Sequence, residues 1–539
     1  MLRKEIALVN KHDSGKSLRW ASRLWLAWLV LLTGMLGRPA QSAAPVAAPD
    51  PLYRVNAPRF DGPVRFAETA ILWFGRVDAT HNWADLRVGY NGDELYLCLA
   101  AFDRRLWYDT SPTLSDLERW DAVTFYLRTS AGAGASPGPD DYRFVAQLNW
   151  WETRPAYQSA YRGGASGWAP AAIPFTTASG WRGNAPNDDL DDRGWVATLH
   201  IPFSSLGLSG APAPGTAWSL GVALHDRDDA AGTAIADQIW PPGMQSQQPP
   251  TWGQLAFGMP SYSPPAATPG GMVVVRQGLN GATVPDAAVG GTTGNLCPGD
   301  TDYIWNHWGD ANFAAVADFN IQNQGDVADW PCFARYYVTF PLDALPAGQA
   351  IISATLTLHQ WGGSGGPGQA EPSLIQVLTV NEGWDEATLT WNNGPLAREN
   401  VAAAWADPLL SSPGWPGAAR TWDVSGAVAE AYAAGHPLRL ALYEADSAYH
   451  SGKYFVSSDT GDWNAAGRPE LSVRWGQPTT EGTPTKTHTP GASASSTATG
   501  TRTPTRTPTS GPTGTAAATA TAPPGGWRYN RLPLLLKDG

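Results

Sequence analysis

Two short runs of carboxylates are the first candidates for chemistry in this sequence. They are Asp188-Asp189-Leu190-Asp191-Asp192 and Asp226-Arg227-Asp228-Asp229. A glycan hydrolase or lyase could use such groups as a general acid and base. Oxygen-rich flexible loops are also what calcium requires, and we favour that interpretation or plain solvated loops over a catalytic pair. The predicted calcium ligands are Asp188, Asp189, Asp191 and Asp192.

Other catalytic signatures lack the sequence context that they need. The run Gly362-Gly363-Ser364-Gly365-Gly366 fits the nucleophile-elbow pattern, but no strand-to-helix pattern surrounds it. The sequence contains no His-Glu-x-x-His motif and no Cys/His cluster with zinc-ligand spacing. Haem ligation by His81, His200 or His225 is disfavoured, because His200 has the pattern of a strand residue and methionines are few. We therefore predict that the protein is not an enzyme.

The charge of the chain limits its partners. The net charge is −12, charged residues make up 16% of the chain, and no lysine occurs between Lys16 and Lys453. A nucleic-acid partner is excluded on this basis, because neutralising phosphates requires a basic face. Tryptophan, by contrast, is abundant, with 27 copies. Its ring suits both sandwich cores and sugar-stacking platforms, and we expect roughly two thirds of the rings in cores or domain contacts.

Alternating patterns predict a β-rich first region over residues 51–259. Asn91-Gly92-Asp93 is a hairpin-type turn, and helical periodicity is scarce, which favours an antiparallel sandwich. Residues 260–271, where Pro, Ser and Ala are frequent, are the predicted linker. The predicted strands are Leu95–Phe102, Asp121–Arg128, Tyr142–Leu148, Gly194–Phe203 and Trp218–His225.

The second region, residues 272–476, has one strongly patterned segment and one helix signal. Within Trp384–Pro395, Thr388 to Thr390 favour a half-buried strand and Asn392 to Pro395 favour a turn. A helix is predicted over Asp423–Gly435, with Val424, Val428 and Tyr432 on one face and Gly435 at its end. We expect this helix to cover an open end of a sandwich.

Motifs of the first region occur in an order that resembles the family 9 carbohydrate-binding modules and the wider DOMON-like sandwiches. In sugar-binding members of that family two tryptophans clamp the sugar. Here the corresponding places hold Glu118 and about Ser246, and Thr124 replaces a polar contact, so that only Arg143 remains. The matching motifs are Asp93-Glu94-Leu95-Tyr96-Leu97, Trp120-Asp121-Ala122-Val123, Tyr142-Arg143-Phe144 and Trp252-Gly253-Gln254-Leu255.

Motifs of the second region resemble the DNRLRE domain, also classed as the family 96 carbohydrate-binding module. They are Arg335 to Pro346, Ile351 to Leu358, Trp384 to Pro395, Trp422 to Val428, Phe455 to Ser458 and Arg468 to Val473. The resemblance implies a β-sandwich on a secreted bacterial protein, with acidic polysaccharides as ligands.

The two ends of the chain differ from its middle. Residues 1–44 have a basic stretch, the apolar run Leu24–Leu32 and a small-residue site at Ala40-Gln41-Ser42, which predicts an export signal, with an uncleaved anchor as the alternative. Residues 477–526 repeat Thr-Pro-Thr and predict a disordered, solvated stalk. The apolar tail, residues 527–539, is interpreted equally as a cell-envelope attachment or as plain stickiness.

The cysteines suggest one bridge. Export favours oxidation, so we predict a disulfide between Cys297 and Cys332, which flank one loop-rich stretch. Cys98 lies in an alternating run and is predicted to be a buried thiol.

Taken together, the sequence predicts an all-β chain with two antiparallel, jelly-roll-like sandwiches in tandem. The favoured function is a secreted or cell-surface protein that binds a polysaccharide through aromatic platforms. The alternatives are a structural or adhesive surface spacer and a divergent glycan-degrading enzyme. The predicted ligand contacts are Trp107, Trp120, Arg143 and Trp151 in the first sandwich and Trp305, Trp308, Trp361 and Tyr449 in the second.

Overall fold

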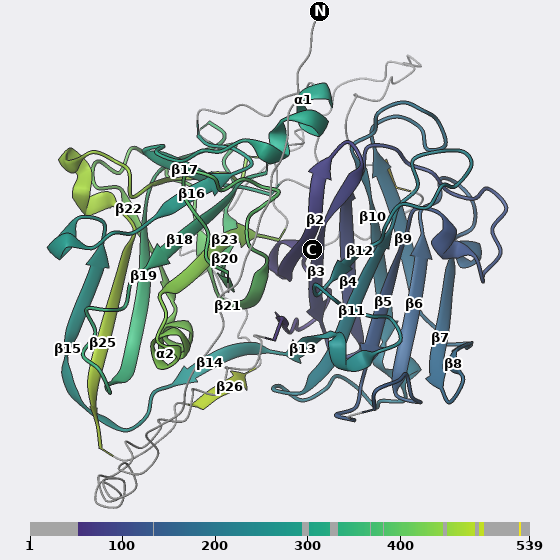
Figure 1. The fold of residues 1–539 in the computed structure, drawn as a ribbon, viewed down its shortest axis with the longest axis horizontal. Helices are drawn as coiled ribbons and strands as arrows, with labels where there is room; N and C mark the ends of the chain where they lie inside the picture. The colour runs from purple at the N-terminus through teal and green to yellow at the C-terminus, as the bar shows by residue number, and fades with distance from the viewer. Residues whose placement is uncertain are drawn as a thin grey trace, which may run out of the picture. The chain divides into compact units, whose positions relative to one another are not determined.

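A computed structural model describes residues 52–132, 134–293, 301–323, 333–366, 368–380, 382–445, 450–479, 485–489 and 528–529. The predicted signal, most of the predicted stalk and tail, Tyr449 and the Cys297/Cys332 pair lie outside these residues. The sandwiches belong to one compact unit that begins at Pro51. The all-β, antiparallel sandwich fold predicted from the sequence is confirmed (Figure 1).

The first sandwich consists of two facing antiparallel sheets. One has the order β2-β3-β4-β10-β9-β27, with strands at Ala70–Asp78, His81–Tyr90, Glu94–Phe102, Gly194–Pro202, Thr176–Arg182 and Arg528–Tyr529. The other has the order β13-β11-β5-β6-β7-β8, with β12 on β11. Its strands are Gly253–Phe257, Ala217–His225, Ala122–Arg128, Asp141–Gln147, Gln158–Gly164, Gly167–Pro170 and, for β12, Gln238–Trp240.

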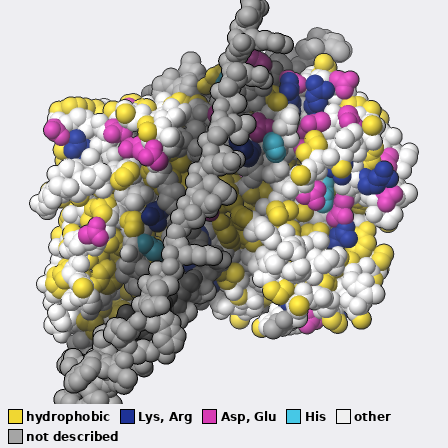
Figure 2. Space-filling model, in the orientation of Figure 1, with side chains coloured by type: hydrophobic (Ala, Val, Ile, Leu, Met, Phe, Trp, Pro, Cys, Tyr) yellow, Lys and Arg dark blue, Asp and Glu magenta, His cyan; other side chains and the backbone are white. Residues whose placement is uncertain are grey.

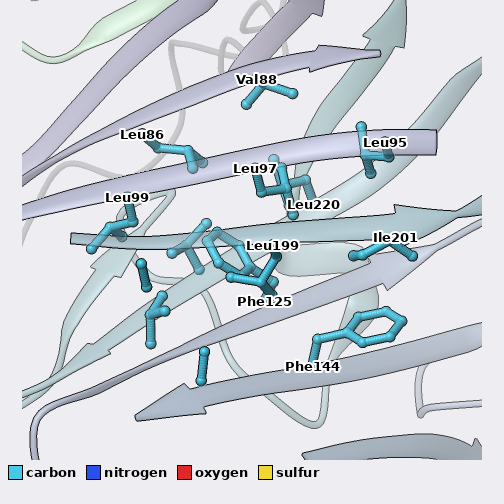
Figure 3. Packing of buried hydrophobic residues seen from close by; sticks show 14 of the residues in the cluster. Leu86, Val88, Leu95, Leu97, Leu99, Phe125, Phe144, Leu199, Ile201 and Leu220 are labelled. Atoms are coloured by element: carbon cyan, nitrogen blue, oxygen red, sulfur yellow. The ribbon is translucent and has the colours of Figure 1, made fainter. Parts of the chain in front are cut away.

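Alternation along the strands places one apolar set between these sheets. Figure 3 shows leucines of β3 and β4, such as Leu86 and Leu97, packing with Phe125, Phe144 and Leu220 of the opposite sheet. Burial of each such side chain stabilises the fold by about 1.5–3 kcal/mol. All five strands predicted for this region are present within one or two residues of the predicted bounds.

The second sandwich is also built from two sheets. Its strands in the first sheet are β16 (Asp286–Val289), β18 (Arg335–Phe340), β23 (Leu438–Glu444), β20 (Ser373–Val380) and β21 (Ala397–Ala406). The second sheet contains β15 (Ala267–Arg276), β25 (Glu470–Pro478), β19 (Ala350–Gly363), β24 (Lys453–Val456) and β17 (Asp318–Ile321), with β22 (Ala418–Asp423) on β19. Outside these sheets, β14 (Met259–Ser263) pairs with β26 (Thr485–Thr489).

Helices are few among the described residues. The α-helices are α1 (Thr301–Asn306) and α2 (Ser425–Ala434). Asp423 Oδ1 accepts a hydrogen bond from the Ser425 backbone N–H at 2.9 Å, and Gly435 ends α2 with φ 71°. The predicted helix is therefore present, with Val424 and Val428 buried against the core of the second sandwich. Short 3-10 turns are η1 (Phe66–Glu68), η2 (Leu117–Arg119), η3 (Arg154–Tyr157), η4 (Phe203–Leu206), η5 (Pro249–Thr251), η6 (Leu279–Gly281), η7 (Trp308–Asp310) and η8 (Asp462–Gly467).

Two local predictions were wrong. Thr388 ends a turn, and Leu389 and Thr390 have no regular secondary structure, because the Asn393 side chain bonds their backbone. Its Oδ1 accepts from Thr390 N–H at 2.7 Å and its Nδ2 donates to Thr388 O at 2.8 Å. The predicted linker, residues 260–271, is largely taken up by β14 and β15. A Cβ on Gly270 would lie 2.2 Å from the Trp475 ring, so glycine there serves close packing on an aromatic ring.

A continuous hydrogen-bonded sheet joins the two sandwiches. Strand β1 (Arg54–Ala57) pairs in parallel with β13 of the first sandwich and with β21 of the second. The Asn56 amide donates to Glu399 Oε1 at 2.8 Å and to Asn400 O at 2.7 Å, and Asn400 Nδ2 returns a bond to Asn56 O at 3.0 Å. These buried reciprocal bonds fix the strands' register.

A shared aromatic cluster buries the rest of this junction. It contains Trp73, Trp83 and Phe102 from the first sandwich and Trp305, Trp308, Trp391 and Tyr443 from the second. The guanidinium of Arg335 lies 3.8 Å from the Trp391 ring centroid and 4.4 Å from that of Trp73. We call this set the junction cluster. Burial lowers the pKa of Arg335, and its charge is compensated by the aromatic faces, by a hydrogen bond from Nη2 to Trp391 O at 3.2 Å and by the charge of Asp85.

Candidate functional site

A group of carboxylates lies where β4 and β11 end, and a second group, Asp286, Glu386 and Asp459, lies in the second sandwich. Asp103 follows β4, and Asp226 and Asp228 follow β11; their carboxylate oxygens lie within 4.8 Å of one another. Asp103 and Asp226 are buried, and Asp228 is half-buried. Asp121 is buried beside them and accepts hydrogen bonds from the backbone N–H groups of Trp107 and Arg227 at 2.6 and 2.9 Å.

The chemistry of this group fits a hard cation. Among the described residues, Asp103 Oδ2 and Asp226 Oδ1 have no hydrogen-bond donor. Burial, and then the charge of Asp228, raise the pKa of Asp226 to about 8, and burial raises that of Asp228 to about 6. A calcium ion would satisfy these oxygens and hold the carboxylates ionised. Asp103, Asp226 and Asp228 are the residues that would bind it.

The predicted calcium ligands lie elsewhere. Asp191 pairs with Arg104, with Oδ1 2.8 Å from Nε, and the exposed Asp189 lies 3.6 Å from Arg105. Asp188 accepts from the Leu190 backbone N–H at 2.8 Å, and Asp192 is buried. The cation cluster therefore contains residues of the second acidic run of the sequence, Asp226 and Asp228, together with the isolated Asp103. The sequence signal that could have identified Asp103 is its position directly after a predicted strand.

Glu118, which the sequence predicted at one of the two positions of a sugar clamp, lies in an ion-pair network. Glu118 pairs with Arg143 and with Thr124 Oγ1, and His225 Nδ1 lies 2.9 Å from Asp237 Oδ1. Burial lowers the pKa of His225, but its bonds to Asp237 and Glu118 outweigh burial and raise it to about 9. Burial by itself would raise the pKa of Glu118, but the hydrogen bond from His225 outweighs burial, and the pKa is lowered to about 2. Both side chains are therefore charged at neutral pH and interact with each other.

The predicted ligand contacts of the first sandwich differ in their solvent exposure. Trp107 is buried, and the ring of Trp120 packs 3.4–3.7 Å from the position of a Cβ on Gly232. Arg143 lies over the Tyr161 ring, 4.5 Å from its centroid. Trp120 is half-buried, and Trp151 is the most exposed of these rings, with 69% of its surface open to solvent.

Trp151 stands on a well-anchored loop. Its ring centroid is 4.4 Å from that of Trp150, which in turn contacts buried Trp181 at 5.3 Å. Glu152 Oε2 accepts from the backbone N–H groups of both Trp150 and Trp151, at 3.2 and 3.1 Å. The ring is thereby held outward on a fixed backbone, as a stacking platform requires.

In the second sandwich the predicted rings are mostly enclosed. Trp305 and Trp308 are fully buried in the junction cluster and present no face to a ligand in this structure. Trp361 is half-buried and lies 5.7 Å from the Tyr454 ring. Tyr449 lies outside the described residues.

Two exposed rings of the second sandwich were not among the predicted contacts. Trp415 and Trp463 keep 58% and 68% of their surface exposed, and their ring centroids are 4.8 Å apart. The signal that could have found Trp415 is its setting, Ser412-Pro413-Gly414-Trp415-Pro416-Gly417, because loop-forming residues on both sides of a tryptophan favour exposure.

A cavity of about 430 Å³ lies beside β14, β21 and α2. Its lining includes Phe60, Tyr262 and Trp405 together with the charged residues Arg59, Glu68 and Asp423. The predicted sugar contacts that the structure describes do not line it. The cavity is therefore part of the joint between the sandwiches and separate from the exposed rings.

The described surface is not strongly basic anywhere that Figure 2 shows: basic side chains form small separate groups, several beside acidic ones. Cys98 is buried, as predicted. No helix among the described residues is long and apolar enough to cross a membrane.

Comparison with known proteins supports the sequence interpretation. Residues 294–474 match the model of carbohydrate-binding module family 96. The predicted resemblance to that family is confirmed over these residues, and the match supports a carbohydrate-binding role for the chain. No protein with a curated description matches the chain.

Similar solved structures include a family 9 carbohydrate-binding module from Caldicellulosiruptor kristjanssonii in complex with glucose. It is 18% identical, with 38% of this chain and 95% of that chain covered and a TM-score of 0.28. A putative carbohydrate-binding protein from Bacteroides uniformis ATCC 8492 is 13% identical, with 38% and 99% covered and the same TM-score, 0.28. Family 9 modules are thus among the solved structures to which this chain is similar.

Proposed function

We propose that this protein is an exported, non-catalytic polysaccharide-binding protein that uses exposed tryptophans on both sandwiches as stacking platforms. The observation that carries the proposal is the exposure of Trp151, Trp415 and Trp463, each with more than half of its surface open to solvent. Large aromatic side chains are normally mostly buried, so the solvent exposure of three anchored rings supports a ligand-binding role. The family 96 match supports a carbohydrate as that ligand.

The arrangement of carboxylates supports binding over catalysis. A glycosidase needs two carboxyl groups about 5–10 Å apart on either side of a sugar in an open site. Two groups of carboxylates converge among the described residues, Asp103/Asp226/Asp228 and Asp286/Glu386/Asp459. In each group the oxygens lie within 4.8 Å of one another, closer than the separation that a catalytic pair on either side of a sugar requires, so both groups suit a cation better than a polysaccharide.

A glycan array and affinity electrophoresis of the full-length protein, with calcium and with chelator, test the proposal. We expect retardation by at least one polysaccharide without release of reducing ends. If no glycan binds while circular dichroism shows a folded β-protein, the favoured function would be a surface spacer. Release of reducing ends would instead establish an enzyme.

A further inference from the structure

Trp415 and Trp463 come from two separate loops of the second sandwich. Trp415 lies between β21 and β22, and Trp463 lies in η8, between β24 and β25. Their rings stand at 88° to each other with centroids 4.8 Å apart. Two perpendicular exposed rings form a corner, in which one ring can serve as floor and the other as wall.

The corner is held in place by close contacts between its two loops. A Cβ on Gly467 of η8 would lie 2.9 Å from the Pro416 carbonyl oxygen and 2.5 Å from Asn464 Nδ2, so the bare glycine lets the loops meet. On the other side of the Trp415 loop, Gly417 has φ 113°, and its Cβ would lie 3.0 Å from the Gln360 carbonyl oxygen on β19. The Trp415 loop is thus tied to both η8 and the sheet.

Trp463 is oriented by its own turn. Arg468 donates to Thr460 O at 2.7 Å and to Asp462 Oδ1 at 2.9 Å, and closes the chain around η8. The Trp463 ring lies against Gly461, where a Cβ would come within 2.9 Å of Cδ1. The ring orientation therefore exists before any ligand binds, which lowers the entropic cost of binding.

Ring geometry selects the form of the ligand. A flat crystalline surface would need coplanar rings, and rings at 88° cannot both lie on one plane. A single chain in solution can instead place the C–H face of one sugar on one ring and its edge against the other. The corner therefore suits a soluble chain.

The charge beside the two rings determines which class of polysaccharide can bind. Asp462, next to Trp463, has a side chain that is 96% exposed, whereas the Arg468 side chain that pairs with it is 11% exposed. An approaching ligand therefore meets the carboxylate more than the guanidinium. Like charges disfavour binding, so a uronate chain is excluded and a neutral one accepted.

We infer that Trp415 and Trp463 form a binding corner for one sugar unit of a neutral, soluble polysaccharide chain. The inference rests on the proposed function and adds to it the residues, the ligand class and the physical form of the ligand. It differs from the acidic ligand that family resemblance implies.

The test is affinity electrophoresis of the full-length protein in gels that contain a neutral β-glucan, xylan, galactomannan or alginate, with a pull-down on crystalline cellulose. We expect retardation by at least one neutral polysaccharide and by neither alginate nor cellulose. Trp415→Ala and Trp463→Ala should each weaken that binding ~10-fold or more, the equivalent of about 1.4 kcal/mol. Gly461→Ala keeps both rings but pushes Trp463 aside, and should weaken binding several-fold.

Leu114→Ala is the control, because it removes an exposed apolar side chain from the other sandwich and should leave retardation unchanged; Trp151→Ala removes the exposed ring of that sandwich. If Trp151→Ala abolishes retardation and the two corner variants retain it, polysaccharide binding stands and the corner is overturned. Retardation by alginate, or retention on cellulose that Trp463→Ala removes, overturns the ligand class. If no polysaccharide retards the wild type, the proposed function fails together with the corner.

Sedimentation velocity separates sugar binding from self-association. We expect the wild type and the Trp415→Ala/Trp463→Ala variant to sediment alike at every concentration. A dimer that disappears in the double variant would assign the corner to a second copy of this chain and overturn the inference. Thermal melting should be unchanged in all variants, since both rings are exposed.

Discussion

Replacing Trp391 by alanine should test whether the two sandwiches are energetically one body. The Trp391 ring is buried, 4.9 Å from the Trp83 centroid and 4.8 Å from that of Trp308. Removing a buried tryptophan costs about 3–5 kcal/mol. Arg335 would also lose the ring 3.8 Å from its guanidinium, which adds about 1–2 kcal/mol for a desolvated cation–π contact. We expect a loss of about 5 kcal/mol in total.

Urea unfolding followed by far-UV circular dichroism, together with calorimetry, measures this loss. The wild type should unfold in one transition because the junction cluster couples the two cores. The variant should unfold in two, since the core of each sandwich stays intact. Trp463→Ala is the control and should change stability by less than about 0.5 kcal/mol. Two separate transitions in the wild type, or a loss below about 1 kcal/mol in Trp391→Ala, would refute the reasoning.

Three further outcomes are expected. Calcium at 100 times its Kd should stabilise the protein by about 2.7 kcal/mol in thermal melts. Asp226→Asn should remove this response, whereas Asp189→Asn should retain it. Equal responses in the two variants would exclude the cluster as the calcium site. Burial raises the pKa of Asp286 to about 7, so the folded state holds a proton that the unfolded state releases above about pH 4. Stability should therefore fall between pH 4 and pH 7, by at most about 4 kcal/mol, and urea titrations of Asp286→Asn should lack this component. Glu152→Gln weakens the acceptor that fixes the Trp151 backbone, and should reduce any binding that Trp151→Ala abolishes while leaving the corner's binding intact.

Local patterns were sufficient to predict most strands and the helix. Alternation of leucines in β4, and of Leu199 and Ile201 in β10, indicates directly which face is buried, and Gly435 indicates the end of α2. Both signals lie within a few residues of the element that they describe. The fold class could therefore be predicted from the sequence.

Long-range contacts decided what could not be predicted. Trp305 and Trp308 have the sequence character of platform rings, and only the distant Trp73 and Trp83 reveal that they lie inside a joint. In the same way, the glycines of residues 260–271 are typical of a linker until the Trp475 ring, some two hundred residues later, packs on them. Asp103 is isolated in sequence and meets Asp226 only because β4 and β11, which precede them, lie in the two facing sheets of the first sandwich. Exposure of Trp415 and Trp463, likewise, depends on which surfaces the joint leaves open.

Strand β1 changes how this chain can be divided. It is the first described strand, yet through Arg54 and Asn56 it pairs with β21 of the second sandwich. Cutting the chain at residues 260–271 would strip β21 of that partner and uncover the junction cluster on both halves. Each half would carry an unpaired strand edge beside exposed tryptophans, the combination that drives aggregation. The two sandwiches should therefore be expressed as one piece, because neither half covers its own share of the joint.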